Sequence, residues 1–254
     1  MSWPADLWAS VVWGGLCLAA LIGPRLLGGR ASQRHDRVTQ QGGSVFLGLG
    51  LMHAGYSLLQ PVVRWSVRRG LSPAAISWAS LVPAAGAGVF AAWGHWGWAT
   101  WGLFLSALLD VLDGAVARAT QNTSAGGAIL DSVLDRYAEF FFFAGVLVFY
   151  RDSLLMQALV LAALFGSLMI TYSTAKAEAL RLIPPRGTMK RSDRITLLVV
   201  GAALTPVSQY WWESPVPGGM AAWPMAVALG MIAVLANVSA VRRFIALSRG
   251  ADHG

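Results

Sequence analysis

The sequence predicts an all-α polytopic membrane protein, on three observations. Hydrophobic residues make up 56% of the 254 residues and charged residues only 12%, whereas soluble domains carry about 25% charged residues. Apolar runs long enough to cross a bilayer as helices recur along the chain. The period-two alternation that marks a membrane β-barrel is absent from the sequence. We therefore expect helices that span a lipid bilayer.

The N-terminal region is predicted to add one transmembrane helix. An apolar run covers residues 7–27, and Pro24-Arg25 stands where a secretory signal would carry small residues for cleavage. Asp6 precedes the run in place of a basic segment, so we expect a retained helix. A polar cytoplasmic linker follows. The chain thus divides into two parts, the N-terminal helix with its linker, residues 1–43, and a membrane domain, residues 44–250.

An interfacial amphipathic helix is predicted ahead of the membrane core. The apolar residues 44–63 lead into Arg64, Arg68 and Arg69, whose helical spacing suits a helix that lies against anionic lipid headgroups. Ser72 and Pro73 then have the residue types of an N-cap and a first helical position. A six-helix transmembrane core follows, with spans at about residues 74–94, 97–118, 128–149, 153–180, 194–211 and 221–246.

The basic residues predict the orientation of these helices. If the linker is cytoplasmic, alternation of the spans leaves Arg151 as the one residue on the far side among the 19 lysines and arginines. The positive-inside rule then places the N-terminus outside and the C-terminus inside the inner (plasma) membrane of the cell. This asymmetry also accounts for the net charge of +7, so no nucleic-acid partner is expected.

Four aspartates flank one turn between two predicted spans. Asp110 and Asp113 lie three residues apart on one helical face, and Asp131 and Asp135 lie four apart on a face of the next helix. The short connection should make the helices antiparallel, so that both pairs point into one space. Clustered carboxylates in a low-dielectric region repel one another and are costly to desolvate. Protonation of some of them, or divalent cations, would remove that cost, and hard oxygen ligands suit Mg²⁺ or Mn²⁺.

The same stretch carries a family resemblance. The pattern D-x₂-D-G-x₂-A-R-x₈-G-x₃-D-x₃-D resembles the signature of the CDP-alcohol phosphotransferases, and every spacing matches, at Asp110, Asp113, Gly114, Ala117, Arg118, Gly127, Asp131 and Asp135. The resemblance implies six transmembrane helices, a cytoplasm-facing active site and a homodimer. It also implies a reaction, in which CDP-diacylglycerol gives its phosphatidyl group to an alcohol and releases CMP.

Roles for the matched residues follow from this resemblance. It implies two Mg²⁺ or Mn²⁺ ions per active site, held by Asp110, Asp113 and Asp131, with Asp135 as the general base and as a further ligand. The nucleotide diphosphate site would be lined by Asp110, Asp113, Gly114, Ala117, Arg118, Gly127 and Asp131. The physical chemistry agrees, because two cations can neutralise a pyrophosphate and polarise the scissile bond. A carboxylate can take the proton of an attacking hydroxyl, although the sequence alone does not rank Asp131 against Asp135.

The acceptor alcohol depends on weaker signals. Residues 171–194 resemble the subgroup of phosphatidylinositol phosphate synthases, which use a phosphorylated acceptor, although Thr174 stands where that subgroup often has a lysine. The resemblance implies an acceptor-phosphate pocket formed by Lys176, Arg191, Arg194 and Arg243, with Arg242 as the competing choice for the last. Several cations that converge on a dianionic phosphate make a reasonable site. Positive-inside sorting alone would also place basic residues here.

Other functions remain open at this point. The acceptor could be a phosphorylated polyol, inositol phosphate or glycerol 3-phosphate, or it could be unphosphorylated serine or inositol. A cation carrier could use the aspartates as an ion site, and a membrane prenyltransferase also binds diphosphate through aspartates and Mg²⁺. The glycines and Arg118 that accompany the aspartates favour the transferase, because a bare cation path needs neither. Prenyltransferases carry two distant Asp-rich motifs, and here the acids fall within one hairpin.

Three further predictions concern residues outside the motif. The run from Phe140 to Phe143 is expected to face lipid or a second subunit. Glu139 and Glu178 are expected to support the site, with Glu178 paired to a pocket cation. Cys17, the single cysteine, offers neither a disulfide nor metal-ligand spacing.

Overall fold

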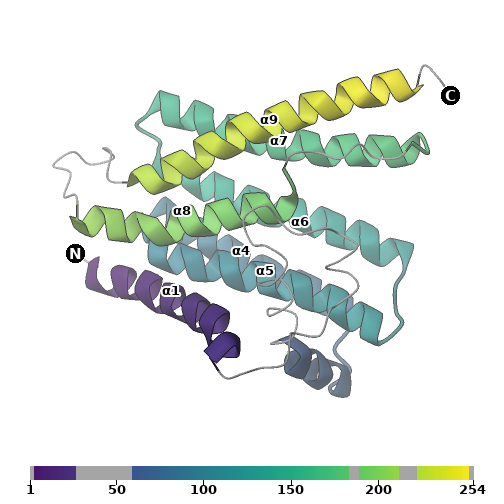
Figure 1. Ribbon diagram of the computed structural model, residues 1–254, viewed down its shortest axis with the longest axis horizontal. Coiled ribbons are helices and arrows are strands. Elements are labelled where there is room, and N and C mark those ends of the chain that lie inside the picture. The colour runs from purple at the N-terminus through teal and green to yellow at the C-terminus, as the bar shows by residue number, and fades with distance from the viewer. Residues whose placement is uncertain (1–2, 27–58, 183–188, 212–221, 252–254) are drawn as a thin grey trace.

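The described part of the computed structural model is entirely helical and covers residues 3–26, 59–182, 189–211 and 222–251. A short helix occupies residues 59–68. Seven long helices are labelled in Figure 1: α1 Trp3–Leu26, α4 Pro73–Ala92, α5 Trp96–Ala119, α6 Ala125–Phe149, α7 Leu154–Ala179, α8 Arg191–Trp211 and α9 Trp223–Ala251. The predicted linker, most of the apolar stretch 44–63 and the boundary between residues 43 and 44 lie outside the described residues. The predicted division into two parts therefore stays a prediction.

The six helices of the core begin within three residues of the predicted positions. The side chain of Ser72 accepts a hydrogen bond from the backbone N–H of Ala75 at 3.2 Å, and Pro73 follows at the first helical position. At the start of α6, Ser124 accepts from the backbone N–H of Gly127 at 3.0 Å. Such caps satisfy N–H groups that have no partner inside the helix. The short polar segment between α5 and α6 is thereby fixed as a turn.

The six helices α4 to α9 form one elongated bundle, with α1 packed along its side (Figure 1). Helix α4 packs against both α5 and α6, α7 packs against α9, and α8 packs between α5 and α9. The turn between α5 and α6 and the C-terminal end of α9 lie at one end of the bundle, and the N-terminal end of α1 lies at the other (Figure 1). This is the arrangement that the predicted alternation of spans requires.

Four helices of the described part are long and apolar enough to cross a membrane, namely α4, α5, α7 and α9. In α1 the apolar segment is shorter, Ala5–Ala19. Helices α6 and α8 carry the acidic and basic residues of the predicted site, which lowers their hydropathy. An all-helical polytopic membrane protein is confirmed, and the number of spans stays a prediction.

The prediction for the phenylalanine run is wrong for two of its four residues. Phe142 and Phe143 are 0% and 1% exposed and belong to the main hydrophobic core, whereas Phe140 is 51% exposed. Successive residues of a helix are about 100° apart, so four consecutive side chains cannot share one face. Half of the run therefore lies inside this subunit and is not available to a second one.

Candidate active site

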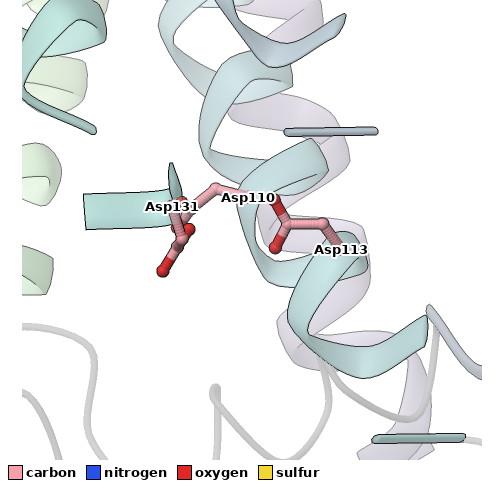
Figure 2. A group of neighbouring side chains, drawn as sticks. All are labelled: Asp110, Asp113 and Asp131. Atoms are coloured by element: carbon pink, nitrogen blue, oxygen red, sulfur yellow. The ribbon is translucent and has the colours of Figure 1, made fainter. Parts of the chain in front are cut away.

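Three of the four predicted aspartates converge at one place. Asp110 and Asp113 come from α5 and Asp131 from α6, and one carboxylate oxygen of each lies within 4.8 Å of the others. Figure 2 shows the three side chains directed into the space between the two helices. Helices α5 and α6 both pack against α4, which holds them as an antiparallel pair with room for these side chains between them. The sequence prediction that the acidic pairs share one space is thus confirmed for these three.

Helix α4 adds a hydroxyl group to this cluster. The hydroxyl of Ser77 donates a short hydrogen bond to Oδ2 of Asp113, and it also lies 3.1 Å from the backbone oxygen of Pro73. Asp113 is only 5% exposed. A buried carboxylate needs hydrogen-bond donors or a cation to offset the loss of water, and Ser77 provides one donor. This contact joins residues 36 apart in the chain and depends on how α4 packs against α5.

Asp135 lies beside the three clustered carboxylates. Its Oδ1 lies 2.6 Å from Nη2 of Arg191, and Nη1 of the same arginine lies 2.8 Å from Oδ2 of Asp110. Arg191 therefore bridges the two pairs of the motif from the first residue of α8. The structure places Asp135 next to the cluster with an arginine as its partner, and its role as a further metal ligand stays a prediction.

A second acid–arginine pair lies one helical turn deeper. Nε and Nη2 of Arg194 both lie 3.0 Å from Oε1 of Glu139, with side-chain exposures of 2% and 8%. Asp135 and Glu139 are four residues apart on α6, and Arg191 and Arg194 are three apart on α8. The two ion pairs thus form successive rungs between the helices. The helical spacing in both segments is compatible with this ladder, but it does not identify which helix supplies the partners.

Three buried guanidinium nitrogens face no acceptor among the residues that the structure describes. They are Nε of Arg191, Nη1 of Arg194 and Nε of Arg243. Nη1 of Arg243, from α9, donates to the hydroxyl of Thr174 on α7 at 3.0 Å, whereas Arg242 is exposed. The geometry therefore favours Arg243 over Arg242 as the predicted pocket residue. Buried donors are nearly always satisfied, so each of these nitrogens is available to a further hydrogen-bond acceptor.

The other predicted site residues lie near the ends of the same helices. Gly114 and Ala117 are partly buried on α5, and Arg118 is exposed near the end of that helix. Gly127 lies in the first turn of α6. Lys176 is exposed on the last turn of α7. Glu178, which was predicted to pair with a cation of the pocket, is also exposed. The acid that pairs with Arg194 is Glu139.

The clustered carboxylates have the chemistry of a divalent cation site. Three converging oxygen atoms suit a hard cation such as Mg²⁺ or Mn²⁺, which usually retains further positions for water and substrate phosphate. The hydrogen bond from Ser77 fixes one of the carboxylates, as a supporting group around a metal site commonly does. The residues present therefore fit a metal that binds Asp110, Asp113 and Asp131.

Comparison with known proteins identifies the family. A family model described as CDP-alcohol phosphatidyltransferase matches residues 70–238, more than half of the chain. The chain belongs to this family. The match includes every motif residue from Asp110 to Asp135 and the arginines of α8. This phosphatidyltransferase is therefore an enzyme of the class that the motif predicts, and membership supports a transferase over the cation carrier and the prenyltransferase.

Relatives of this phosphatidyltransferase share most of its length. The phosphatidylinositol phosphate synthase of Streptomyces avermitilis is 29% identical over 197 residues, which cover 76% of this chain and 78% of that protein. The enzyme of the same name from Mycolicibacterium smegmatis is 32% identical over 190 residues, 73% of this chain and 82% of that protein.

A solved structure shares the fold. The phosphatidylinositol phosphate synthase PgsA1 of Mycobacterium tuberculosis, with CDP-DAG bound, has a TM-score of 0.62 and 25% identity, over 72% of this chain and 90% of that one. The same enzyme has been solved in complex with manganese and citrate, with the same TM-score and identity, over 72% of this chain and 86% of that one. A divalent metal in a relative agrees with the three converging carboxylates of this chain.

Proposed function

We propose that this enzyme transfers the phosphatidyl group of CDP-diacylglycerol to a phosphorylated polyol, with inositol phosphate as the first candidate and glycerol 3-phosphate as the second, and releases CMP in phospholipid biosynthesis. One observation carries the choice of a phosphorylated acceptor. Arg191, Arg194 and Arg243 each direct a buried guanidinium nitrogen that finds no acceptor within the described part of the chain. A phosphate has enough oxygen atoms to accept from all three.

The charges around these arginines support an anionic acceptor. Arg194 and Arg243 are close enough for their charges to interact, and Arg191 is one helical turn from Arg194. Arg191 and Arg194 are already paired with carboxylates, whereas Arg243 donates to the neutral hydroxyl of Thr174. Arginine is the residue best suited to bind phosphate oxygens through several donors. Serine and free inositol carry no phosphate group, so they would leave these donors unused.

The donor side of the site is the aspartate cluster. We propose that Asp110, Asp113 and Asp131 hold two Mg²⁺ or Mn²⁺ ions, which would neutralise the pyrophosphate and make CMP a better leaving group. We propose that Gly114, Ala117, Arg118 and Gly127 contact the nucleotide. The PgsA1 structure with CDP-DAG supports a donor of this class.

Asp135 is the proposed general base. Its carboxylate lies at the boundary between the aspartate cluster and the arginines, since Arg191 contacts both Asp135 and Asp110. An acceptor whose phosphate binds the arginines would place a hydroxyl near this boundary. Asp135 can then take the hydroxyl proton while the oxygen attacks the β-phosphorus of the donor, and the bond to CMP breaks. Arg191 orients the carboxylate for that step.

Topology and assembly complete the proposal. The enzyme is proposed to lie in the inner membrane with the N-terminus outside, the C-terminus inside and the active site toward the cytoplasm. The clustering of the described arginines near the end of the bundle that holds the α5–α6 turn supports this orientation through the positive-inside rule. A homodimer stays a prediction of the family resemblance.

A screen of acceptors tests the proposal directly. Purified enzyme with CDP-diacylglycerol and Mn²⁺ or Mg²⁺ is assayed for CMP release with inositol 1-phosphate, glycerol 3-phosphate, inositol and serine. The expected result is release with one of the phosphorylated acceptors and little with the others. Release that is fastest with serine or inositol would overturn the phosphorylated acceptor. No release with any of the four would contradict the proposal as a whole.

The arginines provide the matched variants. Arg243→Leu is expected to raise the KM for the phosphorylated acceptor by about 10-fold or more, which corresponds to the loss of a charged hydrogen bond. The KM for CDP-diacylglycerol should change little. Arg242→Leu, at the exposed neighbouring position, is the control and should leave both values close to those of the wild type. Equal effects of the two substitutions would show that charge at this end of the molecule, and no defined pocket, attracts the acceptor.

A further inference from the structure

The N-terminal helix α1 contacts two helices of the active site. It lies outside residues 70–238, the part of the chain that the family model matches, and it packs along both α5 and α8 (Figure 1). Helix α5 carries Asp110 and Asp113, and α8 begins with Arg191. Helix α1 thus touches both the helix that carries two of the clustered aspartates and the helix that carries Arg191.

Asp6 of α1 caps the N-terminus of α5. Its Oδ1 accepts hydrogen bonds from the backbone N–H groups of Gly97 at 2.9 Å and Trp98 at 3.2 Å. These groups lie in the first turn of α5, where no partner exists within the helix. Asp6 is 6% exposed, and a carboxylate is favoured there by the positive end of the helix dipole. One buried side chain of α1 therefore accepts hydrogen bonds from two backbone N–H groups of α5.

Further contacts continue along the same two faces. Nε1 of Trp101 donates to the backbone oxygen of Ala9 at 2.9 Å. One turn on, the rings of Trp13 and Phe104 meet edge to face with centroids 6.1 Å apart. The contact residues are three or four positions apart on each helix, so they lie on one face of it. They are Asp6, Ala9 and Trp13 on α1, and Gly97, Trp101 and Phe104 on α5. The two helices therefore meet in a regular parallel seam.

Gly97 provides the close approach at the start of this seam. A Cβ atom at this position would lie 2.0 Å from the backbone oxygen of Asp6 and 3.0 Å from its Oδ1. Any larger residue would push α1 away from α5. The sequence of α5 is thus adapted to receive α1, in a segment of the chain that begins about 90 residues later.

We propose that α1 is an intramolecular clamp that positions α5 in the active site, and that Asp6 is its positioning residue. Asp110 lies 13 residues beyond Gly97, about 20 Å along a stiff helix. A helix fixed at one end by a cap and along its side by a seam has little freedom to rotate or slide. The clamp therefore sets where Asp110 and Asp113 meet Asp131. This inference does not depend on the identity of the acceptor.

Mn²⁺ binding to the full-length protein tests the clamp. Asp6→Ala removes the cap, and Asp6→Asn keeps a carbonyl oxygen that can accept both hydrogen bonds. Leu16→Ala, on the exposed face of α1, is the matched control. We expect Asp6→Ala to weaken Mn²⁺ binding several-fold, as measured by electron paramagnetic resonance well below the melting temperature, and to lower the Tm by about 3–8 °C. Asp6→Asn and Leu16→Ala should stay close to the wild type in Mn²⁺ affinity.

A double-mutant cycle with Gly97→Ala completes the test. If both residues act through one contact, Asp6→Ala should add little to the loss of Mn²⁺ affinity that Gly97→Ala causes. Additive losses would overturn the assignment of Asp6 to this seam. A lower Tm with unchanged Mn²⁺ affinity in the folded protein would show that α1 only anchors the bundle, and would overturn the positioning role. If the Asp6→Ala variant kept both the Mn²⁺ affinity and the Tm of the wild type, the proposal of a clamp would be overturned.

Discussion

Asp135 differs from the other three aspartates of the motif in its position relative to the cluster. Asp110, Asp113 and Asp131 bring their oxygens together, while Asp135 is held by Arg191 at 2.6 Å. Asp135 therefore lies at the edge of the cluster, where its carboxylate can accept a proton. The four aspartates of the motif thus divide into three converging carboxylates and a fourth beside them that is paired with Arg191.

This separation predicts the behaviour of Asp135→Asn. CMP release should fall by about 10²- to 10⁴-fold, because an amide cannot act as a general base. Mn²⁺ and CDP-lipid binding should persist, since the three clustered carboxylates remain. Steady-state kinetics and equilibrium binding measure the two effects, with Asp152→Asn, at an exposed position near the other end of α6, as the control. Full activity in Asp135→Asn would exclude it as the base.

At the scale of elements, pairs of helices are joined by two different kinds of contact. Helices α6 and α8 are linked through the buried ion pair of Glu139 and Arg194. Helices α4 and α6 are linked through glycines that allow the backbones to touch, since a Cβ on Gly88 would lie 2.2 Å from the backbone oxygen of Phe141. Small residues at helix contacts are typical where helices associate within a membrane.

The ion pair predicts asymmetric effects of single substitutions. Glu139→Leu should destabilise the protein by about 3–5 kcal/mol, because the guanidinium of Arg194 would remain buried without its partner. The double variant Glu139→Leu with Arg194→Met should recover most of that stability, since two apolar side chains replace the pair. The same double variant should lose affinity for a phosphorylated acceptor. Thermal unfolding in detergent and acceptor KM values measure these effects, and equal stability of the single and double variants would contradict the pairing.

The glycine contact predicts opposite effects at two positions of one helix. Gly88→Ala should destabilise the bundle by about 1–3 kcal/mol, because its Cβ would overlap the backbone of α6. Gly86→Ala is the matched control, since a Cβ there would meet nothing within 4 Å, and it should be neutral or slightly stabilising because alanine favours the helix. Thermal unfolding of the two variants gives the comparison. Similar losses at both positions would show that the close approach of α4 and α6 is not a determinant of stability.

At the scale of the whole molecule, charge and apolar surface divide the bundle. Large apolar side chains are exposed along its length, and they include Trp78, Val82, Leu154, Leu155 and Phe165. Such a surface suits lipid and would be costly in water. The charged site lies toward the end of the bundle at which α5 turns into α6. The molecule therefore presents polar chemistry at one end of an apolar body.

The proposed topology predicts which positions can be labelled from outside the cell. In a variant with Cys17 replaced by alanine, Asp152→Cys should react with a membrane-impermeant maleimide on intact cells. Gln121→Cys, in the turn between α5 and α6, should react only after the membrane is made permeable. Both residues are exposed in the structure, so access alone does not distinguish them. The reverse pattern of labelling would invert the topology.

Local sequence was enough to predict the class of protein, the approximate positions of the helices and the convergence of three aspartates. Apolar runs fix helices in a bilayer because backbone groups must be satisfied within each segment, and the Ser72 cap is local. The spacing of Asp110, Asp113 and Asp131 is also local, because two helices joined by a short turn bring their faces together. These features need only neighbouring residues, so they could be predicted.

The tertiary structure alone decided which distant groups meet. The partners of Asp135 and Glu139 come from α8, Ser77 reaches Asp113 from α4, and Asp6 caps α5 from the N-terminal helix. The burial of Phe142 and Phe143, which the sequence analysis placed outside, likewise depends on the helices packed around α6. Each of these contacts joins segments far apart in the chain, and its geometry follows from how the helices pack. Residue order constrains that packing only weakly, because lipid-facing and core-facing surfaces are both apolar in a membrane protein.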